Sequence, residues 1–183
     1  MTSQVLVAGI GNIFLGDDGF GCEVIRRLAV FQFPESVRIF DFGIRGFDLA
    51  YALMDGRELT ILVDAVPRGE APGTVYTIEP DLDQLDQLDQ ANLAVETHGM
   101  NPVKVLQLVK SMGGKFNKIL LVGCEPETFG PEEGQMGLSP AVAGSVDRAV
   151  QVIKELIAEF LRNSGQIWEA NNNGQEQWVS ERV

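Results

Sequence analysis

The stretch that decides the fold is LTILVDAV at residues 59–66, an apolar and β-branched run that carries one carboxylate, Asp64, near its end. Such a run predicts a strand that is buried on both faces. Two further runs share this character, QVLVAGI at residues 4–10 and KILLVG at residues 118–123. Strands buried on both faces are typical of a parallel sheet that is covered by helices. The sequence therefore predicts an α/β fold.

The segments between these runs alternate between helical and strand-like periodicity. Apolar residues recur at helical spacing in residues 19–31, 46–55, 101–112 and 138–162. Residues 37–42 predict a further strand, and residues 74–79 alternate as a half-exposed strand does, which is compatible with an antiparallel addition to the sheet. From residue 163 the chain is rich in Asn, Gln, Gly and Glu, so we expect one domain over residues 1–162 and a disordered tail over 163–183.

Composition excludes several classes of protein. The 183 residues suit a single domain, and no apolar run is long enough for a membrane helix. A net charge of −12 argues against nucleic-acid binding, which requires basic patches. Two cysteines and one histidine cannot build a disulfide scaffold, a four-cysteine zinc site or a site with several imidazoles. No basic region precedes the first apolar run, so we expect a cytoplasmic protein.

The negative charge is concentrated in two segments, residues 79–96 and 125–133, which contain acidic side chains and no Lys or Arg. Such segments are usually solvated surface loops. They could also form an acidic rim that steers a basic partner segment toward the protein. The sequence leaves both interpretations open.

Carboxylates lie where the predicted strands end, which is where parallel sheets bind ligands. Asp17 and Asp18 follow the first strand in GIGNIFLGDDGFG at residues 9–21, and Asp64 ends the central run. The loop is not a dinucleotide fingerprint, because Phe14 stands where the third glycine would be, and no Lys follows to make a phosphate loop. Each aspartate alone could instead be a helix cap.

His98, the single histidine, precedes a predicted helix at the same edge of the sheet. A lone histidine is more often a structural residue than a ligand. Together, however, Asp18, Asp64 and His98 would provide two carboxylates and one imidazole, with coordination positions left open. Such a set suits a divalent transition metal such as nickel or zinc, which could polarise a carbonyl group or activate water.

The motifs GIGNIFLGDDGFG, DFGIRGFDLA, LVDAV, THGM and VGCEPETFGPEEGQMGLSP occur in this order and resemble the hydrogenase maturation protease family. The resemblance spans about residues 5–161. It implies a twisted, mostly parallel five-stranded sheet with helices on both faces, and thus a three-layer domain. It also implies that Asp18, Asp64 and His98 are the metal-binding and catalytic residues. The turn that contains Gly43, Arg45 and Gly46 matches a glycine-containing loop near the substrate.

The resemblance further implies an activity. Members of the family are endopeptidases that remove the C-terminal extension of a nickel–iron hydrogenase large-subunit precursor after nickel insertion. The expected metal is therefore the nickel of the precursor, for which other divalent metals could substitute, and the expected partner is that precursor. The resemblance favours a monomer. The alternative is a non-catalytic module that recognises nickel or acts as a chaperone in hydrogenase assembly.

The sequence also supports a prediction for each of three further residues. Asp41, at the end of the second predicted strand, is expected to orient His98 by a hydrogen bond. Cys124 follows a strand and is expected to be a buried, inert thiol, and Cys22 is expected to be a core residue.

Overall fold

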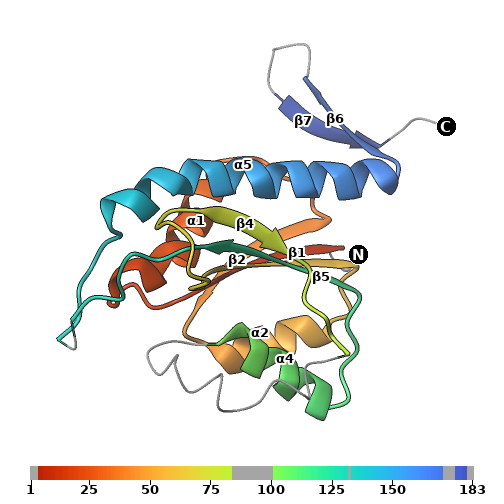
Figure 1. Cartoon of the computed structure of the whole chain (residues 1–183). Helices are drawn as coiled ribbons and strands as arrows, with labels where there is room; N and C mark the ends of the chain where they lie inside the picture. Colours follow the sequence, from red (N-terminus) through yellow and green to blue (C-terminus); the bar gives the residue numbers. More distant parts are fainter. Residues whose placement is uncertain (1–3, 84–100, 132, 171–175, 181–183) are drawn as a thin grey trace.

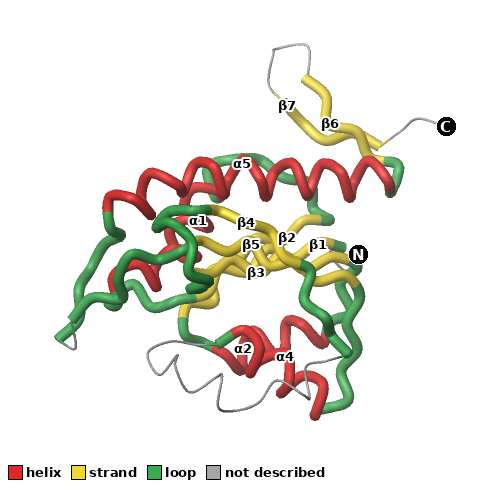
Figure 2. The backbone as a smooth tube through the Cα atoms, viewed as in Figure 1, coloured by secondary structure: helices red, strands yellow, loops and turns green. Residues whose placement is uncertain are grey.

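The computed structural model describes residues 4–83, 101–131, 133–170 and 176–180. It has three layers, in which a twisted sheet lies between two pairs of helices (Figures 1 and 2). Helices α1 (Phe20–Leu28) and α5 (Pro140–Asn163) cover one face of the sheet. Helices α2 (Gly46–Met54) and α4 (Pro102–Ser111) cover the other face. The predicted α/β fold with helices on both faces is confirmed.

The sheet has five strands in the order β2-β1-β3-β5-β4. The strands are β1 (Val5–Ile10), β2 (Val37–Gly43), β3 (Leu59–Ala65), β4 (Val75–Ile78) and β5 (Lys118–Cys124). All neighbours pair in parallel except β4, which is antiparallel to β5, as its alternating pattern had indicated. Every residue of β1 and β3 is buried, which explains their unbroken apolar sequences. The carboxyl ends of four strands therefore meet at one edge.

The alternation of side chains along β1 divides the interior into two cores. Val5 and Val7 pack with α1 and α5, whereas Leu6, Ala8 and Ile10 pack with α2 and α4. In helix α2 the helical pattern does not predict burial correctly at every position. Phe47 is 71% exposed, although the apolar spacing of residues 46–55 predicted a buried side chain.

The start of α1 differs from the sequence prediction. Asp17 and Asp18 lie in a separate 3₁₀ turn, η1 (Gly16–Gly19), and α1 begins at Phe20 without a side-chain cap. The interpretation of the two aspartates as caps of α1 is therefore wrong. Helices α4 and α5 do have side-chain caps, because Asn101 accepts a hydrogen bond from Val103 N and Ser139 accepts one from Val142 N.

The C-terminal segment contains structure that its composition did not predict. Strands β6 (Gln166–Ala170) and β7 (Glu176–Ser180) form an antiparallel hairpin after α5, with Trp168 opposite Trp178 (Figure 1). The expectation of a disordered tail missed this hairpin, and the domain boundary at residue 162 stays a prediction. Within the described ranges, no helix is both long enough and apolar enough to cross a membrane.

Helix α1 lies close against the sheet because one of its residues lacks a side chain. A Cβ atom on Gly21 would lie 2.2 Å from the carbonyl oxygen of Ile10 and 2.3 Å from that of Val63. Both oxygens belong to backbone that is fixed in the sheet, so neither can move away easily. Gly21 thus sets the position of α1, and with it the position of η1, over the carboxyl ends of β1 and β3.

Gly21→Ala is expected to lower the free energy of unfolding by about 2 kcal/mol or more, since overpacking of this kind usually costs about 1–3 kcal/mol. Gly144→Ala is the matched control, because Gly144 lies in α5 with nothing within 4 Å of a built Cβ. That control should gain about 0.5–1 kcal/mol from helix propensity. Urea denaturation measures both, and equal stabilities of the two variants would contradict this account of Gly21.

Candidate functional site

The predicted site lies at the carboxyl edge of the sheet, where η1 packs against β3. Asp18 and Asp64 are both almost fully buried there. The Oδ2 atom of Asp18 accepts a hydrogen bond from Asn12 N at 2.7 Å, and the Oδ1 atom of Asp64 accepts one from Ala65 N at 2.9 Å. Each carboxylate is thus held by a backbone amide, which fixes its orientation.

Cys22 lies within the electrostatic influence of the carboxylates at this edge. Its Sγ atom lies 3.4 Å from the carbonyl oxygen of Gly11. Burial raises the pKa of this thiol to about 12, and a hydrogen bond to Asp41 together with the charges of Asp41, Asp18 and Asp64 adds to the effect. Asp18 and Asp64 come from separate elements but act on one thiol, so they share one electrostatic environment.

The third predicted ligand, His98, lies outside the described residues. In the part of the chain that the structure describes, no three His, Cys, Asp or Glu side chains come together as a metal site would require. The structure thus brings Asp18 and Asp64 to one edge, while the complete three-residue set stays a prediction. The role of Asp41 toward His98 also stays a prediction. The Oδ1 atom of Asp41 accepts a hydrogen bond from Gly43 N at 2.9 Å.

Asp17 has a different role from its neighbour. Its side chain is fully buried and accepts four hydrogen bonds from residues more than 100 positions away in the sequence. The donors are Glu127 N at 2.8 Å, Thr128 N at 3.0 Å, Ser139 N at 2.6 Å and the Ser139 hydroxyl group at 2.9 Å. This carboxylate therefore attaches η1 to the loop between β5 and α5. The sequence could not reveal this role, because all its partners are remote.

The turn after β2 folds its arginine back onto its own backbone. The Arg45 guanidinium donates to the carbonyl oxygens of Asp41 and Phe42, and it lies 5.3 Å from the centre of the Phe40 ring. Gly43 has a φ of 55°, a backbone conformation that glycine adopts without strain. Arg45 thus stabilises the turn. A role of Gly43, Arg45 and Gly46 in substrate binding stays a prediction.

Two residues at the C-terminal end of β5, Cys124 within the strand and Glu125 directly after it, are structural. Glu125 is buried, and its carboxylate accepts hydrogen bonds from Arg68 N at 2.7 Å and Gly69 N at 3.1 Å. The acidic segment 125–133 is therefore not a uniform solvated rim. Cys124 is fully buried beside Ser145, at 3.3 Å, and burial raises the pKa of its thiol. Its interpretation as a buried thiol is confirmed, and the same holds for the burial of Cys22.

Comparison with known proteins identifies what the chain resembles. The family model described as hydrogenase maturation protease matches residues 22–156. The hydrogenase 2 maturation protease of Escherichia coli is 30% identical over 88% of this chain and 93% of its own length. The hydrogenase expression/formation protein HupD of Rhodobacter capsulatus is 33% identical over 85% of this chain and 72% of its own. The structure of the E. coli hydrogenase maturating endopeptidase HybD superposes with a TM-score of 0.65, at 27% identity over 97% of both chains.

Asp17→Ala is expected to lower the free energy of unfolding by on the order of 3 kcal/mol, because four donors, of which the two on Ser139 are buried, would lose their acceptor. Asp147→Ala is the control, since its carboxylate is 83% exposed and forms only a surface ion pair with Arg27. Chemical denaturation of both variants measures the difference. If Asp17→Ala were as stable as the control, the attachment of the β5–α5 loop would not depend on this carboxylate.

Alkylation of Cys22 by iodoacetamide is expected to increase with pH toward a midpoint near pH 12, because the thiolate is the reactive form. Asp41→Asn should lower that midpoint, since it removes a negative charge that opposes thiolate formation. Asp48→Asn, an exposed aspartate on α2, should leave it unchanged. Peptide mapping by mass spectrometry gives the rate at each pH. A midpoint near the ordinary thiol value of about 8.5 would contradict the burial and charge environment described here.

Proposed function

The chain belongs to the hydrogenase maturation protease family, and we propose on this premise that it removes the C-terminal extension of a nickel–iron hydrogenase large-subunit precursor. The observation that carries the proposal is the pair of buried carboxylates, Asp18 and Asp64, at the carboxyl edge of the sheet. The family is one of peptidases, and a buried pair of carboxylates is suited to bind a cation. A cytoplasmic, monomeric protein is part of the same proposal.

The proposed recognition element is the nickel ion of the precursor, which is part of the substrate. Asp18 and Asp64 would supply carboxylate oxygens and His98 an imidazole nitrogen, a donor set that nickel accepts. Two like charges buried near each other repel, and a divalent cation between them would relieve that repulsion. A precursor that carries nickel would therefore bind this edge better than one without it.

The reaction is hydrolysis of one peptide bond. Water adds its hydroxyl group to the carbonyl carbon, the C–N bond breaks, and the leaving amine takes up a proton. The nickel of the precursor, bound by Asp18, Asp64 and His98, would supply Lewis-acid chemistry, which lowers the barrier to hydrolysis by withdrawing charge from a carbonyl group. The contribution of this chain is orientation, because the amides of Asn12 and Ala65 fix the carboxylates before the substrate arrives.

Asp18→Asn and His98→Ala are expected to fold normally and to lose processing of a nickel-loaded precursor by about 100-fold or more. Even residues that only support a metal ligand usually contribute about 10–100-fold. Mass spectrometry of the precursor detects the loss of its C-terminal peptide. Glu159→Gln is the control, because it changes an exposed carboxylate in the C-terminal half of α5 and should process at the normal rate.

The same measurement separates the two candidate roles. Cleavage that requires both this protein and nickel supports the endopeptidase. Binding of the precursor without any cleavage by the unaltered protein would favour the non-catalytic nickel-recognition module. Unchanged cleavage by Asp18→Asn or His98→Ala would show that the assignment of these residues is wrong.

A further inference from the structure

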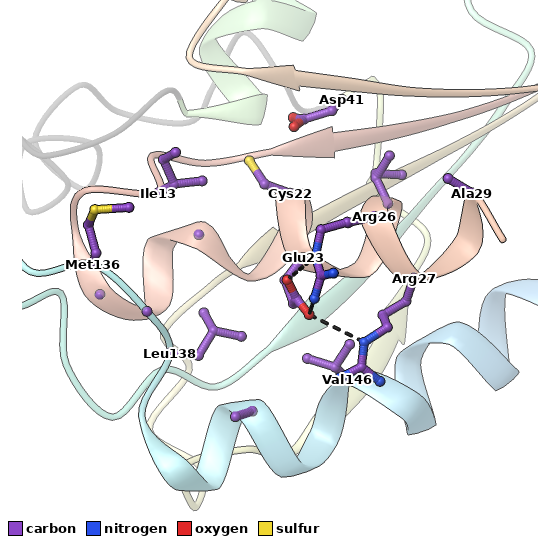
Figure 3. A pocket seen from close by; sticks show the side chains of 15 residues that line it. Ile13, Cys22, Glu23, Arg26, Arg27, Ala29, Asp41, Met136, Leu138 and Val146 are labelled. Atoms are coloured by element: carbon purple, nitrogen blue, oxygen red, sulfur yellow. Dashed lines mark hydrogen bonds and ion pairs between the residues drawn. The ribbon is translucent and has the colours of Figure 1, made fainter.

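A groove of about 660 Å³ runs over the outer surface of α1, beside the site (Figure 3). One wall comes from the β1–α1 loop and from β2, and the other comes from the end of the β5–α5 loop and the first turns of α5. The residues that line it include Ile13, Cys22, Asp41, Met136, Leu138 and Val146. The lining is mostly apolar, and Figure 3 shows Ile13 and Met136 near each other at one end of the groove.

The two side chains at this end are unusually exposed for their size. Met136 is 69% exposed and Ile13 is 46% exposed, and Phe14 beside Ile13 is also exposed. Contiguous exposed apolar surface of this kind marks binding sites more often than ordinary surface. Methionine also adapts its shape to different apolar partners.

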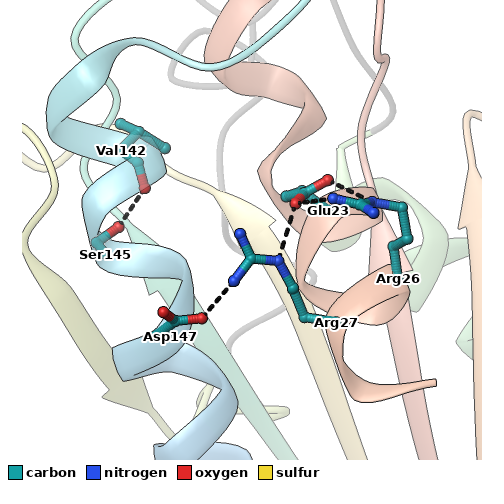
Figure 4. Close-up of polar contacts among 6 residues, drawn as sticks. All are labelled: Glu23, Arg26, Arg27, Val142, Ser145 and Asp147. Atoms are coloured by element: carbon teal, nitrogen blue, oxygen red, sulfur yellow. Dashed lines mark hydrogen bonds and ion pairs between the residues drawn. The ribbon is translucent and has the colours of Figure 1, made fainter. Parts of the chain in front are cut away.

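The charged residues along the groove neutralise one another (Figure 4). The Arg26 guanidinium binds the Glu23 carboxylate at 2.5 Å, and Arg27 binds Asp147 at 2.5 Å and Glu23 at 3.3 Å. The two arginines thus balance two carboxylates. Asp41 also lines the groove, so the lining contains two arginines, Arg26 and Arg27, and two carboxylates, Glu23 and Asp41, and has no net charge. In a chain with a net charge of −12, a mostly apolar surface without net charge complements an uncharged apolar segment and gives a charged one no advantage.

The groove is continuous with the proposed site. Gly16 and Gly19, the two ends of the η1 turn that carries Asp18, line it directly. Cys22 and Asp41 also line it, and Cys22 lies within the electrostatic reach of Asp18 and Asp64. A chain segment in the groove would therefore have one end next to the residues proposed to act on the scissile bond.

We propose that this groove binds, in extended form, an apolar stretch of the C-terminal extension that the precursor loses. The inference rests on the proposed function and names the part of the substrate that the groove recognises. The groove is concave and lies between a loop and two helices, so an extended segment can enter it. The folded body of a subunit presents a convex surface, which fits such a groove less well. Binding through the extension also distinguishes precursor from product, because cleavage removes those contacts and the mature subunit is released.

The test measures the Kd of the full-length protein for purified precursor without nickel, which is not cut, and the KM and kcat for nickel-loaded precursor. Met136→Asp and Ile13→Asp should each raise Kd and KM about 10-fold or more, because the complex would lose the burial of an apolar side chain and would have to bury a charge instead. The kcat should stay near normal, since neither residue belongs to the proposed catalytic set. Met112→Asp is the matched control, an exposed methionine at the end of α4 on the opposite face of the sheet, and should change neither constant.

A second substrate completes a double-mutant cycle. A precursor whose extension has its apolar residues replaced by serine should bind the unaltered protein as weakly as the native precursor binds Met136→Asp. Combining both changes should weaken binding no further. Unchanged Kd for both groove variants, or fully additive effects in the cycle, would overturn the inference. Absence of cleavage by the unaltered protein would instead contradict the proposed function, and the Kd values would still test the groove.

Discussion

The buried carboxylate of Asp17 is the interaction on which the arrangement of the site depends. A charge without solvent or partners would be very unfavourable, and four hydrogen bonds from Glu127, Thr128 and Ser139 compensate for its burial. These bonds connect the first loop of the chain to the last crossover and to the start of α5. This side chain, together with backbone hydrogen bonds from Gly16 N to Gln135 O and from Gln135 N to Phe14 O, positions both the η1 turn and the wall of the groove that contains Met136.

The two adjacent aspartates therefore have different roles, and the geometry of the turn explains this difference. A 3₁₀ turn has about three residues per turn, so consecutive side chains point roughly 120° apart. Asp17 points toward the β5–α5 loop, whereas Asp18 lies at the edge of the sheet with its carboxylate on Asn12 N. The DD pair thus couples a structural connection directly to a candidate ligand, and a displacement of one would displace the other.

The sequence predicted those features that depend on local pattern. Burial on both faces leaves unbroken apolar runs, so β1, β3 and β5 could be recognised, and parallel pairing then placed Asp18 and Asp64 at a common edge. Features that depend on remote contacts were missed. The partners of Asp17 lie 110 to 122 positions away, the groove joins α1 to the start of α5, and Glu125 is buried by a turn at Arg68. No local pattern encodes such contacts, and the β6–β7 hairpin was hidden by a composition typical of disorder.

The groove and the carboxylate pair also differ in chemistry, and this difference has a consequence for selectivity. The carboxylates favour a cation, whereas the groove, whose arginines are already paired with Glu23 and Asp147, favours an uncharged apolar segment. Under the proposed function, a precursor without nickel satisfies only the groove, and a mature subunit that has lost its extension satisfies only the metal-binding edge. Only a nickel-loaded precursor satisfies both. The precursor would thus make two interactions, one between its nickel and the carboxylates and one between its extension and the groove, and Asp17 helps to hold these two sites at a fixed separation. Cleavage can therefore be restricted to the one stage of assembly at which the nickel and the extension are both present.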